Sequence, residues 1–135
     1  MSTEYERIAE LLEELLGQEK HRFPQKRQPL DAPEKHGVYI IRKNDTVRHV
    51  GRTLCGRYGL RQRLADHLAG NSSFVRDDDD FNGEGARLRG NGYTYQYLVV
   101  ECPRKRALLE ALAAGTLCPA HVGTGDRQAR SNQAC

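Results

Sequence analysis

Cysteine pairs of the kind that bind zinc are missing from this chain. Its four cysteines stand far apart, at positions 55, 102, 118 and 135, and form no CxxC pair. The spacing therefore does not fit a zinc ribbon or a zinc finger. The nearest metal-like fragment is Cys118-x-x-His121, for which we favour a buried cysteine beside a turn over a metal site.

Long apolar runs are missing as well. No stretch approaches the length of a membrane-spanning helix, and the N-terminus, Met1 to Glu4, lacks the basic and then apolar profile of a signal peptide. We therefore expect a cytoplasmic protein without membrane contact. The 135 residues, 38% of them hydrophobic, suffice for one domain with a modest core.

A strong excess of one charge is also absent, since the formal net charge is only +3. The distribution of the charges is more informative than their sum. Residues 37–70 carry seven basic against two acidic residues, the basic ones being Arg42, Lys43, Arg48, Arg52, Arg57, Arg61 and Arg63. Clustering of this kind is typical of phosphate-binding domains. The acidic run from Asp77 to Asp80 could recruit a cation, but we favour a solvated loop.

The N-terminal region predicts one helix and a connector. Apolar residues from Ile8 to Leu16 recur at helical spacing, Thr3 and Glu6 form a capping box, and Gly17 suits the helix end. We expect this amphipathic helix to cover the core, with docking of a partner as the alternative. Residues 18–35 contain three prolines and several basic residues, which predicts an extended connector without regular structure. It would act as a tether or lie along a phosphate backbone.

The remainder alternates strands and helices. Residues 38–41 and 47–51 flank a turn and predict a β-hairpin, and residues 93–101 alternate as a third strand. Leucines at 60, 64 and 68 predict a helix that ends at Gly70, and Pro103 begins another that runs to Gly115. Residues 71–92 should form a long loop, with a brief ordered piece near residues 86–89.

A few residues on these elements have side chains suited to chemistry. Tyr39 and His49 lie on the hairpin, and Arg63 and His67 stand one turn apart on the following helix. Glu110 is the only formally charged residue between positions 107 and 120. A buried, unpaired carboxylate is costly, so Glu110 should reach solvent, meet an arginine such as Arg106, or ligate a cation.

In this order and at these spacings the residues resemble the GIY-YIG nucleases, including those of the excinuclease type, over roughly residues 35–122. The motifs are Gly37-Val38-Tyr39 and His49-Val50-Gly51, followed by Arg63, His67 and Glu110. Pro119 stands where the family commonly has proline, and Arg52 stands where some members have lysine. His49 replaces the tyrosine that usually begins the second motif, and Val122 replaces an asparagine that many members have near the site.

The resemblance implies an α+β fold, a small three-stranded mainly antiparallel sheet flanked by helices, here with an extra N-terminal helix. We expect the helix at 1–17, the connector at 18–35, the nuclease-like domain at 36–122 and a flexible tail at 123–135. The implied activity is endonucleolytic hydrolysis of DNA. Implied catalytic residues are Tyr39, His49, Arg63, His67 and Glu110, and Arg52, Arg57 and Arg61 would contact phosphate.

The cofactor implied by the resemblance is a single Mg²⁺ or Mn²⁺ ion on Glu110, with no small-molecule cofactor. Arg63 would clamp the scissile phosphate and Tyr39 would orient or deprotonate the attacking water. Two alternatives remain open at this point: a DNA-binding module that has lost cleavage, motivated by His49 and Val122, and an interaction protein that docks through its first helix. The sequence leaves DNA specificity, biological pathway and oligomeric state undetermined.

Overall fold

The computed structural model describes residues 2–121. Its centre is a four-stranded antiparallel sheet in the order β1-β4-β2-β3. The strands are β1 (His21–Arg22), β2 (Gly37–Lys43), β3 (Thr46–Arg52) and β4 (Tyr93–Val99). The expected α+β class and antiparallel sheet are confirmed, and β1 adds a short fourth strand to the expected three.

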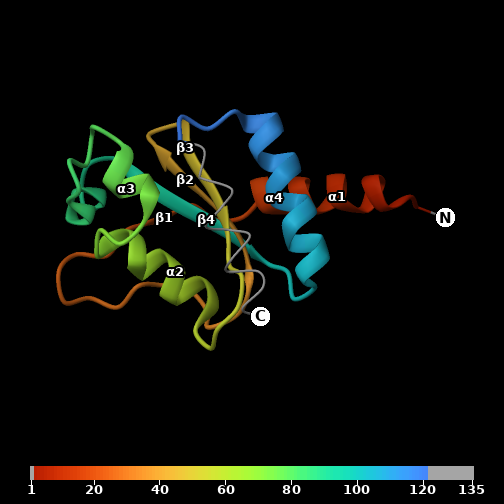
Figure 1. Cartoon of the computed structure of the whole chain (residues 1–135), viewed down its shortest axis with the longest axis horizontal. Helices are drawn as coiled ribbons and strands as arrows, with labels where there is room; N and C mark the ends of the chain where they lie inside the picture. Colours follow the sequence, from red (N-terminus) through yellow and green to blue (C-terminus); the bar gives the residue numbers. More distant parts are fainter. Residues whose placement is uncertain (1, 122–135) are drawn as a thin grey trace.

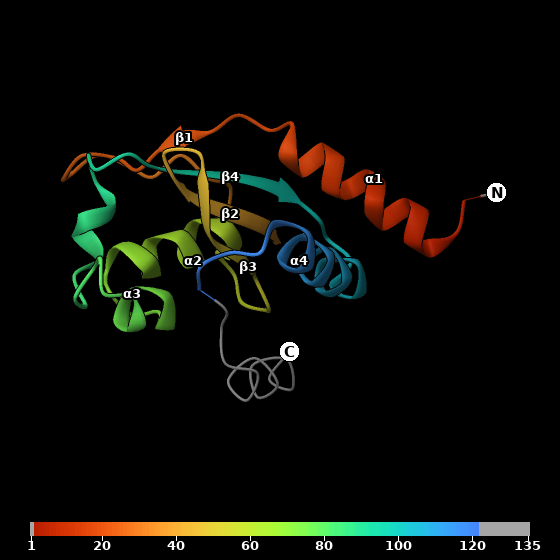
Figure 2. The same ribbon diagram turned by 90° about the horizontal axis from the view of Figure 1, so that it is seen from above.

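Helices cover both faces of the sheet (Figure 1, Figure 2). Helices α1 (Glu4–Leu16) and α4 (Pro103–Leu117) share one face, while α2 (Gly59–Leu68), α3 (Ser73–Asp77) and a 3₁₀ turn, η1 (Gly85–Leu88), lie on the other. Side chains alternate along a strand, so Val38 and Ile40 of β2 enter the core under α1 and α4. Tyr39 and Ile41 enter the core under α2 and α3. This alternation places Tyr39 on the same side as α2.

Helix α1 is a covering helix, as its pattern predicts. Its stripe of Ile8, Leu11, Leu12 and Leu15 is buried against α4 and the sheet. The Thr3 hydroxyl accepts a hydrogen bond from the Glu6 amide at 3.1 Å and caps the first turn. None of the helices within residues 2–121 is both long and apolar enough to cross a membrane.

The connector between α1 and β2 contributes to the fold. Its residues His21 and Arg22 pair with Tyr95 and Thr94 of β4, so the expectation of no regular structure is wrong for these two positions. Phe23 is buried in the core beside Tyr95. The pairing of β1 and the buried Phe23 therefore attach the connector to the sheet.

The segment between α2 and β4 is more ordered than its polar composition suggests. The expected brief ordered piece is present as η1, but α3 was not expected. Phe74, Phe81 and Leu88 are fully buried and fix this segment against the sheet. Apolar residues spaced this widely carry no recognisable period, which is why the sequence predicts only a loop.

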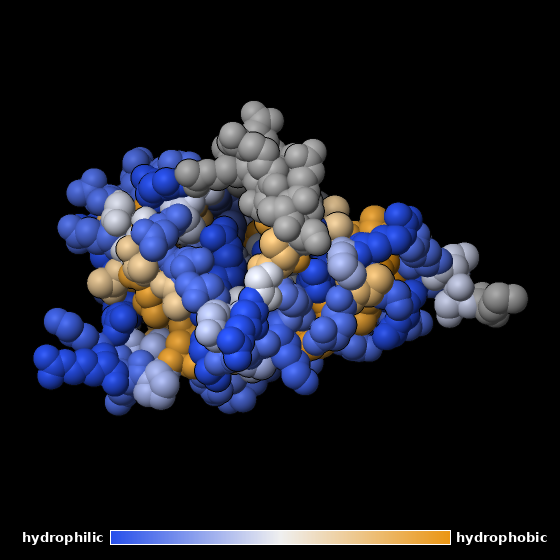
Figure 3. Space-filling view, turned by 60° about the horizontal axis from the view of Figure 1, so that its bottom comes forward, coloured by the Kyte–Doolittle hydropathy of each residue, from blue (hydrophilic) through white to orange (hydrophobic). Residues whose placement is uncertain are grey.

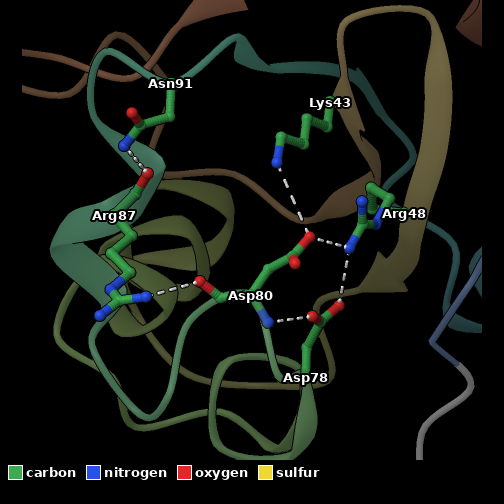
Figure 4. A network of polar contacts seen from close by, with 6 residues as sticks. All are labelled: Lys43, Arg48, Asp78, Asp80, Arg87 and Asn91. Atoms are coloured by element: carbon green, nitrogen blue, oxygen red, sulfur yellow. Dashed lines mark hydrogen bonds and ion pairs between the residues drawn. The ribbon is translucent and has the colours of Figure 1, made fainter.

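The acidic run lies in this segment and forms ion pairs, as Figure 4 shows. Arg48 of β3 contacts the carboxylates of both Asp78 and Asp80, and Lys43 approaches Asp80 at 3.8 Å. Asp78 to Asp80 form a loop, as expected, whereas Asp77 is the last residue of α3. The solvated interpretation is wrong for Asp78, whose side chain is only 12% exposed. These pairs join the loop to the β2–β3 hairpin.

Candidate active site

A pocket of about 540 Å³ opens at the β3 edge of the sheet. Strands β2 and β3, the loop after β3, helix α2 and helix α4 all contribute to its wall. Six of the residues singled out from the sequence line it, namely Tyr39, His49, Arg52, Arg57, Arg63 and Glu110. Glu110 comes from α4 on one face of the sheet, and Arg63 comes from α2 on the other.

Gly51 makes room for the Tyr39 side chain. The two residues are opposite each other in the β2–β3 ladder, and a Cβ at position 51 would overlap the phenol oxygen. The absence of a side chain therefore lets the Tyr39 ring cross β3 and reach the pocket. This explains why a glycine in the second motif accompanies a tyrosine in the first.

Tyr39 begins a buried chain of hydrogen bonds. Its hydroxyl lies 2.7 Å from His67 Nε2, and His67 Nδ1 lies 2.6 Å from the Ser72 hydroxyl. His67 is completely buried, and burial lowers its pKa well below the usual value, so its ring is neutral. The sequence did not point to Ser72, although its position as the N-cap of α3 is a recognisable signal.

The Tyr39 phenol is in its neutral form near pH 7. Burial raises its pKa above the usual 10, while the positive charge of Arg63 opposes that rise. A phenol in this state donates or accepts a hydrogen bond but does not remove a proton from water unaided. Arg63 is therefore the group that makes ionisation of Tyr39 less costly.

His49 is buried beside this chain. Its ring stacks on Phe74, with centroids 4.7 Å apart and an angle of 12° between the planes, and its centroid lies 5.2 Å from that of His67. Burial, helped by the charges of His121 and Arg63, lowers its pKa to about 3. Its Nε2 atom has no hydrogen-bond partner among residues 2–121.

Glu110 pairs with Arg52 across the pocket wall. Arg52 Nε donates to Glu110 Oε1 at 3.0 Å, and the two side chains are 12% and 15% exposed. Burial raises the pKa of Glu110 above its usual value, despite the opposing charges of Arg52 and Arg63. The alternative pairing of Glu110 with Arg106 is wrong, because Arg106 donates to backbone carbonyls, including that of Leu54.

The remaining two arginines differ in position. Arg57 lies at the pocket rim, with its guanidinium carbon 5.7 Å from the centre of the Tyr58 ring. Tyr58 is 45% exposed. The face shown in Figure 3 is mostly hydrophilic, with smaller hydrophobic areas between. Arg61 points away from the pocket and binds the Ala32 carbonyl and the Glu34 carboxylate of the connector. The structure does not bring Arg61 to the other candidate residues.

After α4 the chain returns to β3 beside His49. Cys118 ends the helix in a left-handed conformation, with φ at 49°, and its thiol is exposed, so the buried-cysteine interpretation is wrong. The next residues run beside β3, and His121 Nδ1 comes within 3.2 Å of His49 Nδ1. His121 was singled out only for its spacing from Cys118. Val122 lies outside the described residues.

The residues of this pocket fit a hydrated divalent cation better than a metal enclosed by protein ligands. Residues 2–121 contain no group of three or more histidine, cysteine or acidic side chains placed to hold a metal ion. Glu110 is nevertheless a carboxylate on the pocket wall whose burial is compensated mainly by one guanidinium. Magnesium binds through one or two carboxylates while keeping several waters, so this donor suits it.

The fold is similar to the GIY-YIG N-terminal endonuclease domain of UvrC from Thermotoga maritima. That domain bound to its catalytic divalent cation, magnesium, has 20% identity over 87% of this chain and 98% of its own, with a TM-score of 0.47. A point mutant of the domain has 19% identity over 88% and 98%, with a TM-score of 0.48. No family model matches the sequence, and no curated protein is significantly similar to it. Because these TM-scores lie below 0.5, we base function on the pocket.

Proposed function

We propose that this protein is a cytoplasmic, divalent-metal-dependent endonuclease that hydrolyses phosphodiester bonds of DNA. One observation carries the proposal: Tyr39, Arg63 and Glu110, from three separate elements, line a single pocket. A phenol, a guanidinium and a carboxylate are the groups that orient water, bind a phosphate and hold a hard cation.

Arginines supply the binding of phosphate. Arg63 is a planar donor that matches two phosphate oxygens and clamps the scissile group. Arg52 and Arg57, which also line the pocket, contact the same or a neighbouring phosphate. Arg61, bound to the connector, contributes only to the charge outside the pocket.

Tyr39 orients the attacking water, with His67 and His49 beside it. The Tyr39 hydroxyl orients the water and passes its own proton to neutral His67 Nε2, so that the phenolate oxygen, stabilised by Arg63, can take up the proton of the water. His49 lies next to both rings and takes the place of the usual tyrosine of the second motif.

Glu110 is the proposed ligand for Mg²⁺ or Mn²⁺. When bound, the cation supplies charge that polarises the phosphate and stabilises the leaving oxygen. Arg52 is the present counter-charge of Glu110, so it neutralises this carboxylate when the cation is absent. A cation held by Glu110 would free this guanidinium for the substrate.

Cleavage of supercoiled plasmid by the purified full chain, with and without Mg²⁺ or Mn²⁺, tests the proposal. We expect nicking that depends on the metal and falls at least a hundredfold in Tyr39→Phe and Glu110→Gln, as for loss of an acid–base or electrostatic group. Matched controls are Tyr5→Phe and Glu84→Gln, since Tyr5 is exposed and Glu84 lies outside the pocket. Both should cut at the rate of the unchanged protein.

A DNA-binding module without cleavage is the second candidate, favoured by the imidazole at position 49. DNA binding measured by fluorescence anisotropy separates the two. Binding that is intact in every variant, together with no cleavage under any metal condition, would replace the nuclease proposal with this one. Nicking that Tyr39→Phe and Glu110→Gln leave unchanged would point to a contaminating enzyme.

A further inference from the structure

Ser72 is the far end of the hydrogen-bond chain that begins at Tyr39. Its hydroxyl lies 2.6 Å from His67 Nδ1, and His67 Nε2 lies 2.7 Å from the Tyr39 hydroxyl. The imidazole in the middle is completely buried, and Ser72 is 1% exposed. Tyr39 and Ser72 both line the pocket, whereas His67 lies behind them. The chain therefore leaves the pocket wall at a phenol, crosses the interior and returns to the wall at a hydroxyl.

The proposed cleavage gives this chain a proton to move. Tyr39 passes its proton to His67 Nε2 before the phenol oxygen takes up the proton of the attacking water. A neutral imidazole carries one proton, and the ring becomes charged if it holds a second. Burial lowers the pKa of His67 well below its usual value, and the charge of Arg63 lowers it further. The ring therefore accepts the Tyr39 proton at least cost if it releases its own proton at the same time.

The Ser72 hydroxyl is placed to receive the proton that His67 releases. A neutral His67 that accepts at Nε2 carries its proton on Nδ1, and the Ser72 oxygen is the hydrogen-bond partner of Nδ1. A hydroxyl can accept one proton while it gives up its own, so it passes a proton on without becoming charged. The position of Ser72 on the pocket wall lets that proton leave to solvent in the pocket.

We infer that Ser72 is a positioning residue that acts through His67, as the second carrier of a proton relay from Tyr39. In one concerted shift the Tyr39 O–H bond breaks as an N–H bond forms at His67 Nε2. At the same time the His67 Nδ1–H bond breaks as an O–H bond forms at Ser72, and Ser72 releases its original proton to water in the pocket. His67 stays neutral, and its Nε2–H now donates to the Tyr39 phenolate.

The reverse shift resets the relay after cleavage. Ser72 takes a proton from water in the pocket, and Tyr39 releases the proton that it took from the attacking water. The relay deepens the proposed nuclease function and rests on it for the proton that Tyr39 gives up.

Ser72 has a structural role in addition to the relay. As the N-cap of α3 it accepts a hydrogen bond from the Val75 amide at 3.4 Å. Asparagine caps helices about as well as serine. Its side-chain oxygen can accept from both the Val75 amide and His67 Nδ1, but this oxygen has no proton to pass on. Ser72→Asn therefore keeps the cap and breaks the relay, whereas Ser72→Thr keeps both.

Single-turnover cleavage of plasmid DNA by the full chain with Mg²⁺ is the first readout. We expect the rate at saturating protein to fall at least about tenfold in Ser72→Asn and Ser72→Ala, as for loss of a proton-transfer group. Ser72→Thr should keep most of the rate, and so should the control Ser73→Ala on the same wall. DNA affinity should be unchanged in every variant. In mixtures of H₂O and D₂O the rate should curve with deuterium content in the unchanged protein, because several protons move together, and should be linear in Ser72→Asn.

The second readout needs no cleavage. It is the ¹⁵N spectrum of the histidine-labelled full chain without DNA, with His67 assigned by its loss in His67→Phe. We expect a pyrrole-like Nδ1 and a pyridine-like Nε2, because the relay starts with the His67 proton directed at Ser72.

A proton on His67 Nε2 in this spectrum overturns the inference, because Tyr39 could then not pass its proton to the ring. A folded Ser72→Asn protein that cuts at the unchanged rate also overturns it, since Ser72 would then only cap α3. If Ser72→Asn fails to fold, Ser72→Ala and Ser72→Thr decide, and an equal loss of rate in both overturns the relay. If no form cuts DNA, the proposed function fails, while the spectrum still decides whether His67 is set to pass a proton to Ser72.

Discussion

The Arg52–Glu110 pair provides a test of the site that does not require catalysis. Arg52→Met removes the guanidinium and keeps much of the apolar volume of the side chain. Because both partners are largely buried, at 12% and 15% exposure, the substitution leaves a carboxylate without its counter-charge. Breaking a buried pair in this way costs about 3 kcal/mol. For a chain of this size we expect the melting temperature to fall by roughly 12 °C near pH 8.

The loss of stability in Arg52→Met should depend on pH in a defined direction. Burial already raises the pKa of Glu110 above 4.5, and removal of Arg52 raises it further because the main opposing charge is lost. Between the unfolded and the folded pKa, the folded chain holds a proton that the unfolded chain has released. Stability therefore falls as the pH rises through this window. The stability difference between Arg52→Met and the unchanged protein should become smaller as the pH is lowered toward 4.5.

A divalent metal ion should replace the positive charge that Arg52 places beside Glu110, and so restore stability. Magnesium at a hundred times its Kd stabilises a folded protein by about 2.7 kcal/mol, so it should recover most of the loss in Arg52→Met through Glu110. The assay is urea unfolding of the unchanged protein, R52M, E110Q and R52M/E110Q, each with and without Mg²⁺. R52M/E110Q should be more stable than R52M and should not respond to the metal.

The control for this series is Arg104→Met, which breaks an exposed pair with Glu4 and should cost less than about 1 kcal/mol. The reasoning is refuted if R52M unfolds at the same urea concentration as the unchanged protein. It is equally refuted if Mg²⁺ stabilises E110Q as much as R52M, because the metal would then act elsewhere.

Three further outcomes follow from the structure. Gly51→Ala should lower both the melting temperature and plasmid cleavage, because the added methyl group overlaps the Tyr39 phenol; an unchanged rate and melting temperature would contradict this contact. Tyr58→Ala should raise KM for DNA about fivefold with kcat unchanged, since an exposed ring at the pocket rim can stack on a base. Lowering the pH from 7.5 to 5 should cost about 2 kcal/mol through His49, because its pKa of about 3 means that only the unfolded chain takes up a proton. Urea unfolding at both pH values should show a smaller loss in His49→Phe.

The sequence predicts those parts of the fold that depend on local patterns. Spacing, capping and turn residues predict the α1 stripe, the β2–β3 hairpin, strand β4 and helices α2 and α4. Strand β1 and helix α3 could not be predicted from such patterns. Strand β1 is two residues of a basic connector that become a strand only by pairing with β4. Helix α3 is a short apolar segment that is fixed by packing against the sheet.

The candidate site divides in the same way. A pattern orders Tyr39, Arg63 and Glu110 along the chain, and the pocket brings them to one place. The spacing of residues in the sequence does not predict which side chains contact one another across the fold. Glu110 pairs with Arg52 on a strand instead of with Arg106 on its own helix, and His49 meets His121 after the chain has turned back along β3.

The position of α4 has a consequence for how the protein is made. The phenol and the guanidinium belong to segments synthesised early, but the carboxylate arrives with the last helix of the described chain. In a nascent polypeptide whose α4 is still inside the ribosome, the pocket would thus lack Glu110, and the proposed nuclease would not yet be able to cut nucleic acid. Reactivity would be acquired only once this helix has emerged and docked against the sheet.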